Sequence, residues 1–165
     1  MAPKAEKNLT NLFQETLKDI YYAEKQILRA LPKMAKSAQS AELAAAFQKH
    51  RDETEVHVER LEQVFELLGV QARGKTCDAI IGIIDEGKEI MEDFAGTAAL
   101  DPGLLAAAQA VEHYEISRYG TLRTWAQQLG MKDAVKLLDL TLGEEKATDA
   151  ALSQLATTAV NAKAA

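Results

Sequence analysis

Apolar residues recur at steps of three and four along most of the chain, the spacing of one face of an α-helix. The first stripe predicts a helix over about residues 8–38, which Pro32 should kink or shorten. A second helix follows from an N-cap at Ser40 and ends at Gly69. A third, shorter stripe covers about residues 76–94 and is predicted to lie at the periphery.

Two more long helices are predicted in the second half of the chain. One begins at Asp101 and Pro102, because an aspartate caps well and proline suits the first helical position, and it ends at Gly130. The last covers about residues 132–160, and Gly143 falls inside it. Glycines inside helices, here Gly120 and Gly143, suggest a close backbone approach or a local distortion.

The two halves of the chain share a register. Laying Glu24 on Glu115 also lays Glu53 on Glu144, and it superimposes several apolar positions. We therefore predict an all-α four-helix bundle built from two helix hairpins, with the short helix on the crossover between them. The 165 residues form one domain, with an ordered core over about residues 8–160.

Composition narrows the class of protein. Hydrophobic residues make up 47% of the chain, aromatic residues 5%, and the one cysteine, Cys77, excludes an internal disulfide. No signal-peptide or membrane-spanning stretch is visible, so we expect a soluble cytoplasmic protein. The net charge is −6 with both signs interleaved, which offers no basic stripe to a nucleic acid.

Carboxylates interrupt the apolar stripes. Glu24 lies between Ile20 and Ile27, and Glu115 occupies a corresponding position in the second half. An ionised carboxylate taken out of water is unfavourable unless a cation, a shared proton or a salt bridge compensates it. A metal ion held by several carboxylates is one solution, and a flank position from which the side chain reaches water is the alternative.

The second helix adds nitrogen ligands. Glu53 and His57 are four residues apart on one face, a spacing that suits one carboxylate and one imidazole on a single ion. His50 lies two turns before His57 on the same stripe, so it is either a ligand, a support for a ligand or a hydrogen-bonded core residue. A lone buried histidine is usually a hydrogen-bonded core residue.

The second half supplies further acids. Glu112 and Glu115 share a face, as do Glu145 and Asp149, while Glu144 lies beside the seam. The alternative for the run from Glu144 to Asp149 is a solvated face paired with a lysine.

Tyr119 belongs to a group of tyrosines near the level of Glu24 and Glu115. It could hydrogen-bond a ligating carboxylate or supply an electron, or it could simply pack in the core. No nucleophilic triad or phosphate-binding glycine loop is present, and Cys77 has no activating base beside it in the sequence.

Several segments carry a resemblance: YYAEKQ, HRDET, VEHYEISRYGTL and GEEKATD. With these, the chain resembles the YciF/YciE-like bacterial stress proteins of the ferritin-like superfamily from about residue 8 to residue 160. The resemblance implies a ferritin-like bundle, commonly dimeric, with a role in stress responses and an unsettled activity. It places the glutamates of the first and third bundle helices at Glu24 and Glu115. The Glu-x-x-His pattern of ferritins is absent from the other two helices.

Two hypotheses follow. In the first, the protein binds one or two ions of iron or manganese between its helices and protects against oxidative stress. This hypothesis does not specify whether the protein is an enzyme. The expected ligands are Glu24, Glu53, His57, Glu115, Glu144 and Glu145, surrounded by His50, Glu112, Tyr119 and Asp149.

In the second hypothesis, the bundle is a non-enzymatic structural or partner-binding protein without metal. Its buried acids are then neutralised by one another, by Arg118 and Arg123, or by water. In both cases the resemblance implies a homodimer, formed through the apolar side of residues 80–90 or an outer helix face.

Overall fold

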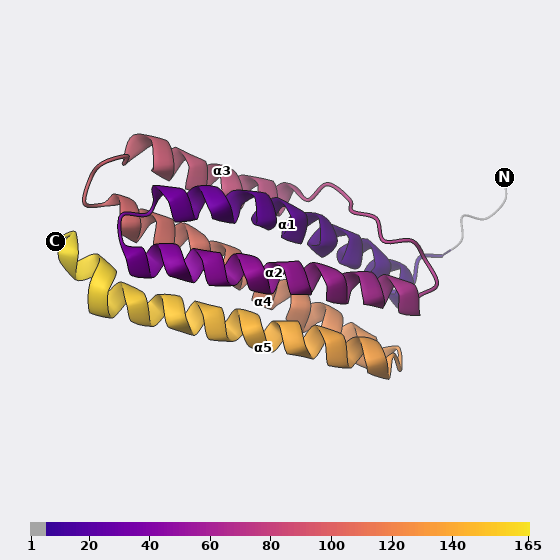
Figure 1. Cartoon of the computed structure of the whole chain (residues 1–165). Helices are drawn as coiled ribbons and strands as arrows, with labels where there is room; N and C mark the ends of the chain where they lie inside the picture. Colours follow the sequence, from indigo (N-terminus) through magenta and orange to yellow (C-terminus); the bar gives the residue numbers. More distant parts are fainter. Residues whose placement is uncertain (1–5) are drawn as a thin grey trace.

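The structure, a computed structural model, describes residues 6–165 as five α-helices without a strand (Figure 1). The start of the chain, residues 1–5, lies outside this description. The helices are α1 (Leu9–Ser37), α2 (Ala41–Leu67), α3 (Asp78–Asp93), α4 (Leu100–Gln128) and α5 (Lys132–Leu155). After α5 the chain continues as a π-helical turn, Ala156–Val160, and a short 3₁₀ turn, Asn161–Lys163.

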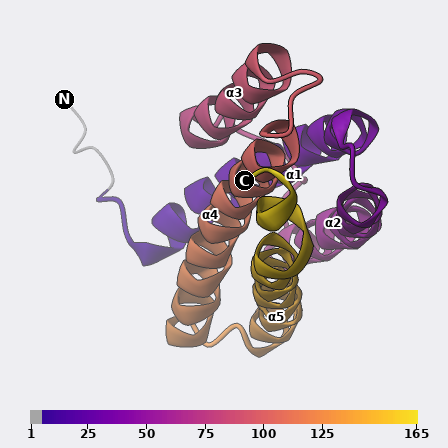
Figure 2. The same cartoon turned by 90° about the vertical axis from the view of Figure 1, so that its left-hand side faces the viewer.

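Four long helices form a bundle of two antiparallel hairpins, α1 with α2 and α4 with α5. The hairpins meet where α2 packs on α5 and α1 packs on α4. Helix α3 lies outside this bundle, on the crossover between the hairpins, against α4 and α1 (Figure 2). This is the arrangement that the sequence repeat predicted. Among the described residues, no helix is long and apolar enough to cross a membrane.

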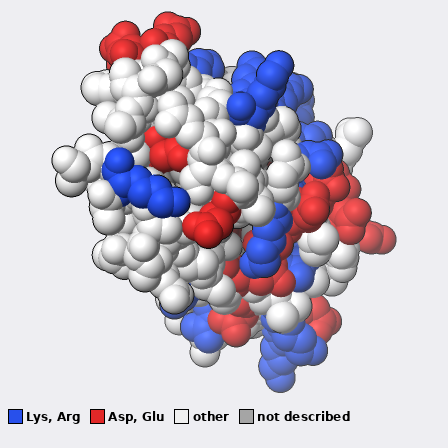
Figure 3. Space-filling model, turned by 60° about the vertical axis from the view of Figure 1, so that its left-hand side comes forward, with Lys and Arg blue, Asp and Glu red and all other residues white. Residues whose placement is uncertain are grey.

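The apolar side of α3 faces α1 and α4 within one chain. Ile80 is buried, and Ile83, Ile84 and Ile90 are half-buried against the core. Both this side of α3 and an outer helix face stay candidates for a dimer interface. On the face drawn in Figure 3, lysines and arginines lie next to aspartates and glutamates, and no continuous basic stripe crosses it.

Local signals set most of the helix ends. The Ser40 side chain accepts the N–H of Leu43 at 3.3 Å and so caps α2, as predicted. Pro32 does not end α1, which continues to Ser37. A side chain added at Gly120 or Gly143 would meet nothing within 4 Å, and α5 runs through Gly143 unbroken, so neither glycine marks a close approach or a distortion.

The prediction that Asp101 caps its own helix is wrong. Helix α4 begins one residue earlier, at Leu100, and receives no side-chain cap from its N-cap residue Ala99. The Asp101 carboxylate instead accepts the N–H groups of Gln39 at 2.8 Å and Ser40 at 2.6 Å. Asp101 thus has the sequence position of a helix cap, but its carboxylate binds the turn between α1 and α2, which packs against it.

We expect Asp101→Ala to lower the free energy of unfolding by roughly 1.5–3 kcal/mol, because two backbone N–H groups lose a charged acceptor. Urea denaturation of both proteins measures the difference. Asp133→Ala is the matched control: Asp133 is also in a first helical turn, but it is exposed, and among residues 6–165 it pairs only with Lys136. It should change stability by less than about 0.5 kcal/mol, and an equal loss in both variants would contradict the assigned role.

Candidate metal centre

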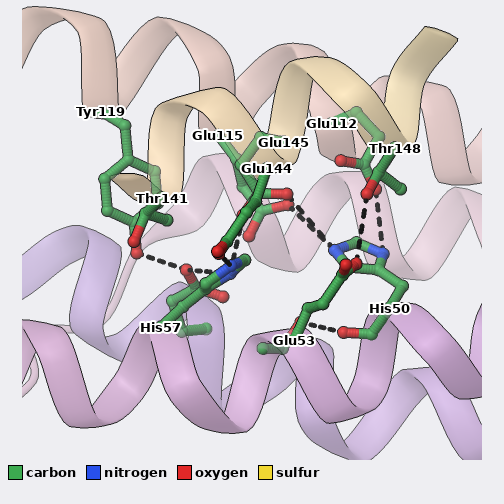
Figure 4. A network of polar contacts seen from close by, with 12 residues as sticks. His50, Glu53, His57, Glu112, Glu115, Tyr119, Thr141, Glu144, Glu145 and Thr148 are labelled. Carbon is green, nitrogen blue, oxygen red and sulfur yellow. Dashed lines mark hydrogen bonds and ion pairs between the residues drawn. The ribbon is translucent and has the colours of Figure 1, made fainter. Parts of the chain in front are cut away.

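Carboxylates from three helices and imidazoles from the fourth meet inside the bundle (Figure 4). Each lies on the buried stripe of its helix, so helical spacing alone directs it inward. The four carboxylates are 0% exposed and the two imidazoles at most 2%. They belong to Glu24 of α1, His50 and His57 of α2, Glu112 and Glu115 of α4, and Glu145 of α5.

The first cluster, which we call the His50 group, consists of His50, Glu112, Glu115 and Glu145. One ligand atom from each lies within 4.8 Å of the others. Nδ1 of His50 is 2.9 Å from Glu112 Oε1, and Nε2 is 3.4 Å from Glu145 Oε2 and 3.8 Å from Glu115 Oε2. Three carboxylates from two helices therefore surround one imidazole.

The second cluster, the His57 group, consists of Glu24, His57 and Glu145. Nδ1 of His57 lies 2.9 Å from Glu145 Oε1 and 3.6 Å from Glu24 Oε1. Glu145 belongs to both clusters, with one oxygen toward each imidazole. The two groups are thus joined through a single carboxylate.

An arginine fixes the outer side of His57. Nε2 of His57 donates to Glu144 Oε2 at 2.9 Å, and Arg60 binds the same carboxylate through both terminal nitrogens, at 2.5 and 3.0 Å. The Arg60 contact, more than the opposing effect of burial, holds the pKa of Glu144 below its usual range. Glu144 orients the imidazole so that Nδ1 faces Glu24 and Glu145, the arrangement commonly seen behind histidine ligands.

Tyr119 completes the His57 side. Its hydroxyl donates to Glu24 Oε1. Burial, followed by the nearby Glu24 carboxylate, raises the pKa of Tyr119 well above its ordinary value, so the phenol stays protonated and remains a donor. Of the three roles considered for this tyrosine, the structure shows the hydrogen bond to a carboxylate together with burial in the core.

Two expected participants lie elsewhere. Glu53 is partly exposed, pairs with Lys49 at 2.8 Å and accepts a 3.4 Å contact from the Thr148 hydroxyl. Asp149 pairs with His113 at 3.2 Å on the outside of the bundle. The structure brings neither into the two groups, so the four acids of the sequence repeat do not all meet.

The arginines proposed to neutralise the buried acids also point elsewhere. Arg118 lies over the ring of Tyr114, and Arg123 pairs with Asp139 at 2.9 Å. The guanidinium that reaches the centre is that of Arg60. It was missed in the sequence, although it lies three residues after His57, the spacing of neighbours on one helix face.

The negative charge of the buried carboxylates is reduced in two ways, by protonation of some of them and by the positive charge of the two imidazoles. Burial raises the pKa of Glu112 to about 8 and that of Glu115 well above its ordinary value. Burial lowers the pKa of each histidine, but the surrounding carboxylates outweigh it and raise the pKa of His50 to about 10 and that of His57 to about 9. Burial likewise raises the pKa of Glu145, but the two imidazoles outweigh it and lower that pKa to about 2.

The donor set fits a transition metal. Several buried oxygens and nitrogens of the two groups lack a hydrogen-bond partner among the described residues: both oxygens of Glu112, Glu115 and Glu145, one oxygen of Glu24, Nε2 of His50 and Nδ1 of His57. Their ion-pair distances come without hydrogen-bond alignment. Such atoms are unfavourable in a protein interior, and a cation would compensate them. Carboxylate oxygen with imidazole nitrogen suits iron or manganese.

Comparison with known proteins finds a matching family and several similar structures. Residues 8–165 match the model of DUF892, a domain of unknown function. The chain is 45% identical to Protein YciF of Escherichia coli (strain K12) over 159 residues, 96% of each sequence. The crystal structure of the E. coli stress protein YciF matches with a TM-score of 0.90 and 44% identity, over 94% of this chain and 99% of that one. YcfI from Rhodopseudomonas palustris matches with a TM-score of 0.88 and 44% identity, over 93% and 98%. These matches confirm the resemblance inferred from the sequence and the all-helical architecture.

Proposed function

The chain belongs to the DUF892 family, and we propose that it is a ferritin-like stress-response protein whose bundle core binds two ions of iron or manganese. The His50 group would hold one ion and the His57 group the other. The stress role rests on the relative YciF, which is described as a stress protein. We also propose a cytoplasmic homodimer formed through the apolar side of residues 80–90 or an outer helix face.

The observation that carries the proposal is the position of Glu145. It is fully buried, and its two oxygens face different imidazoles, at 3.4 Å on the His50 side and 2.9 Å on the His57 side. Glu145 would therefore be a ligand common to both groups, which favours one di-metal site over two unrelated sites.

The surrounding residues would orient the ligands. The Tyr119 hydroxyl holds one oxygen of Glu24 and leaves the other without a partner. Glu144 and Arg60 hold the outer nitrogen of His57, so its inner nitrogen faces the cluster. When bound, a pair of such ions supplies electron exchange with oxygen or peroxide, which would protect against oxidative stress.

Metal analysis tests this proposal. After purification without chelator, loading with Fe²⁺ or Mn²⁺ and removal of excess, we expect the wild type to retain about two equivalents. Glu115→Gln should lose most of the His50-side ion, because an amide replaces a carboxylate ligand. Glu53→Gln is the matched control on a residue outside both groups and should load normally. Less than about a tenth of an equivalent in the wild type would overturn the proposal.

A second candidate function has one observation in its favour. The raised pKa values of Glu112 and Glu115, together with the two protonated imidazoles beside Glu145, let the centre balance its charge with protons alone. A structural or partner-binding bundle without metal would use this balance. Under that reading the metal analysis finds nothing bound, and Glu115→Gln leaves stability unchanged or raises it.

A further inference from the structure

A cavity of about 180 Å³ lies between α1, α3 and α4, on the side of the bundle away from α5. Its walls are largely apolar: Ile27 and Met34 of α1, Ile83 and Met91 of α3, and Val111 of α4 contribute. An apolar cavity of roughly 150 Å³ can hold a molecule the size of benzene. This one therefore has room for a small apolar body.

The charged side chains that line this cavity are basic. Arg29 and Lys33 of α1 and Lys88 of α3 contribute to its lining, which contains no aspartate or glutamate. Lys88 pairs with Asp85 at 2.7 Å, whereas no described carboxylate lies within ion-pair distance of Arg29 or Lys33. The chain has a net charge of −6, so an apolar cavity whose lining includes lysine and arginine but no aspartate or glutamate differs in charge from the chain as a whole.

We infer that the cavity binds a small carboxylic acid with an apolar body. The apolar part occupies the space between the helices, and the carboxylate lies at the exposed ends of Arg29 and Lys33. This division, with an apolar body enclosed and a few polar groups fixing the orientation, is typical of small-molecule sites. The inference does not rest on the proposed metal, because none of the three cations belongs to the metal-binding groups.

The cavity also reaches the buried centre. His50 forms part of its lining while the imidazole contacts the carboxylates of Glu112 and Glu145. A bound acid would therefore place its apolar end against the His50 group. This gives the ligand site a physical connection to the core of the bundle.

Titration of the metal-free full-length protein with octanoate tests the inference, with octylamine as the matched probe of opposite charge. We expect saturable binding of octanoate and binding of octylamine at least about tenfold weaker. Two of the methionines, Met34 and Met91, line the cavity, and Met131 does not. Their labelled methyl signals should shift on adding octanoate, while that of Met131 stays in place.

Variants separate the site from general surface charge. The double change Arg29→Glu with Lys33→Glu alters two exposed side chains and should weaken octanoate binding at least about tenfold. Lys132→Glu with Lys146→Glu makes the same change in net charge at exposed positions outside the cavity and should not. Ala30→Phe should fill the cavity and abolish binding.

Three results would overturn the inference: no saturable binding of octanoate, equal affinity for both probes, or equal loss of binding in both double variants. The metal analysis is independent of all three. A chain that loads metal but binds no octanoate refutes the cavity site alone, and the reverse result refutes the metal site alone.

Discussion

Replacing Glu145 with alanine is expected to lower the free energy of unfolding of the metal-free protein by about 3–5 kcal/mol at neutral pH. Glu145 is fully buried and is the carboxylate that both imidazoles share. Its removal leaves His50 without an ionised partner, because the pKa of Glu112 is raised to about 8, and leaves His57 with Glu144 alone. His50 must then give up its proton or remain a poorly compensated buried charge. Urea denaturation followed by circular dichroism measures the loss.

Glu115→Gln is the matched comparison for Glu145→Ala. Burial, followed by the neighbouring carboxylates, raises the pKa of Glu115 well above its ordinary value, which favours the neutral acid. An amide of similar volume replaces it with little change in charge, and stability should stay within about 1 kcal/mol or rise. If both substitutions destabilised the protein equally, the charges assigned to these two glutamates would be wrong. Both variants should nevertheless lose metal, which separates a structural role from a ligating one.

Helix existence and helix ends follow from local signals, and the sequence therefore predicts them. Gly69 and Gly130 lie two positions after the last residues of α2 and α4 and have φ values of 67° and 73°, the left-handed region that glycine adopts without strain. Ser40 caps α2 within its own turn. In each case the residue and its partner are a few positions apart in the chain.

The sequence predicted which part of each helix faces the metal centre, but it did not resolve which of two adjacent residues points inward. Successive residues differ by about 100° in direction, because a turn contains 3.6 residues. Glu144 and Glu145 are adjacent, yet Glu145 faces both imidazoles while Glu144 reaches Arg60 at the edge. Glu53 is likewise turned to the flank beside Thr54, which is buried. Packing of the helices against one another fixes this rotation, and periodicity alone resolves it poorly.

The hydrophobic pattern of the sequence did not predict contacts between residues that are far apart in the chain. Asp101 has the residue type and the neighbour of a helix cap, but the turn between α1 and α2 presents two N–H groups to it. The Arg60 guanidinium finds Glu144 on another helix for the same reason. Neither contact has a spacing signature, because each depends on how the two hairpins dock.

The metal-free protein is expected to lose stability as the pH rises from about 6.5 to about 10. The pKa of His50 is raised from an ordinary 6.5 to about 10, so its contribution is complete below pH 6.5 and disappears as the pH rises through 10. The pKa of Glu112, raised to about 8, acts in the same direction, because the folded state favours the protonated acid. Glu145, with a pKa lowered to about 2, remains ionised throughout this range. One pKa unit corresponds to about 1.4 kcal/mol, so the combined loss is on the order of several kcal/mol.

Melting temperatures from pH 6 to pH 10 at constant ionic strength measure this loss. Glu112→Gln should flatten the profile between pH 6.5 and pH 8, because the amide has no proton to lose there. A melting temperature that stays constant or rises toward pH 10 would contradict the protonation assigned to the centre. Metal affinity should change in the opposite sense, since protons on Glu112 and the two imidazoles must leave before these groups can ligate an ion. A metal-binding centre therefore predicts that alkaline pH destabilises the metal-free protein while it tightens metal binding, whereas an inert bundle predicts only the first effect.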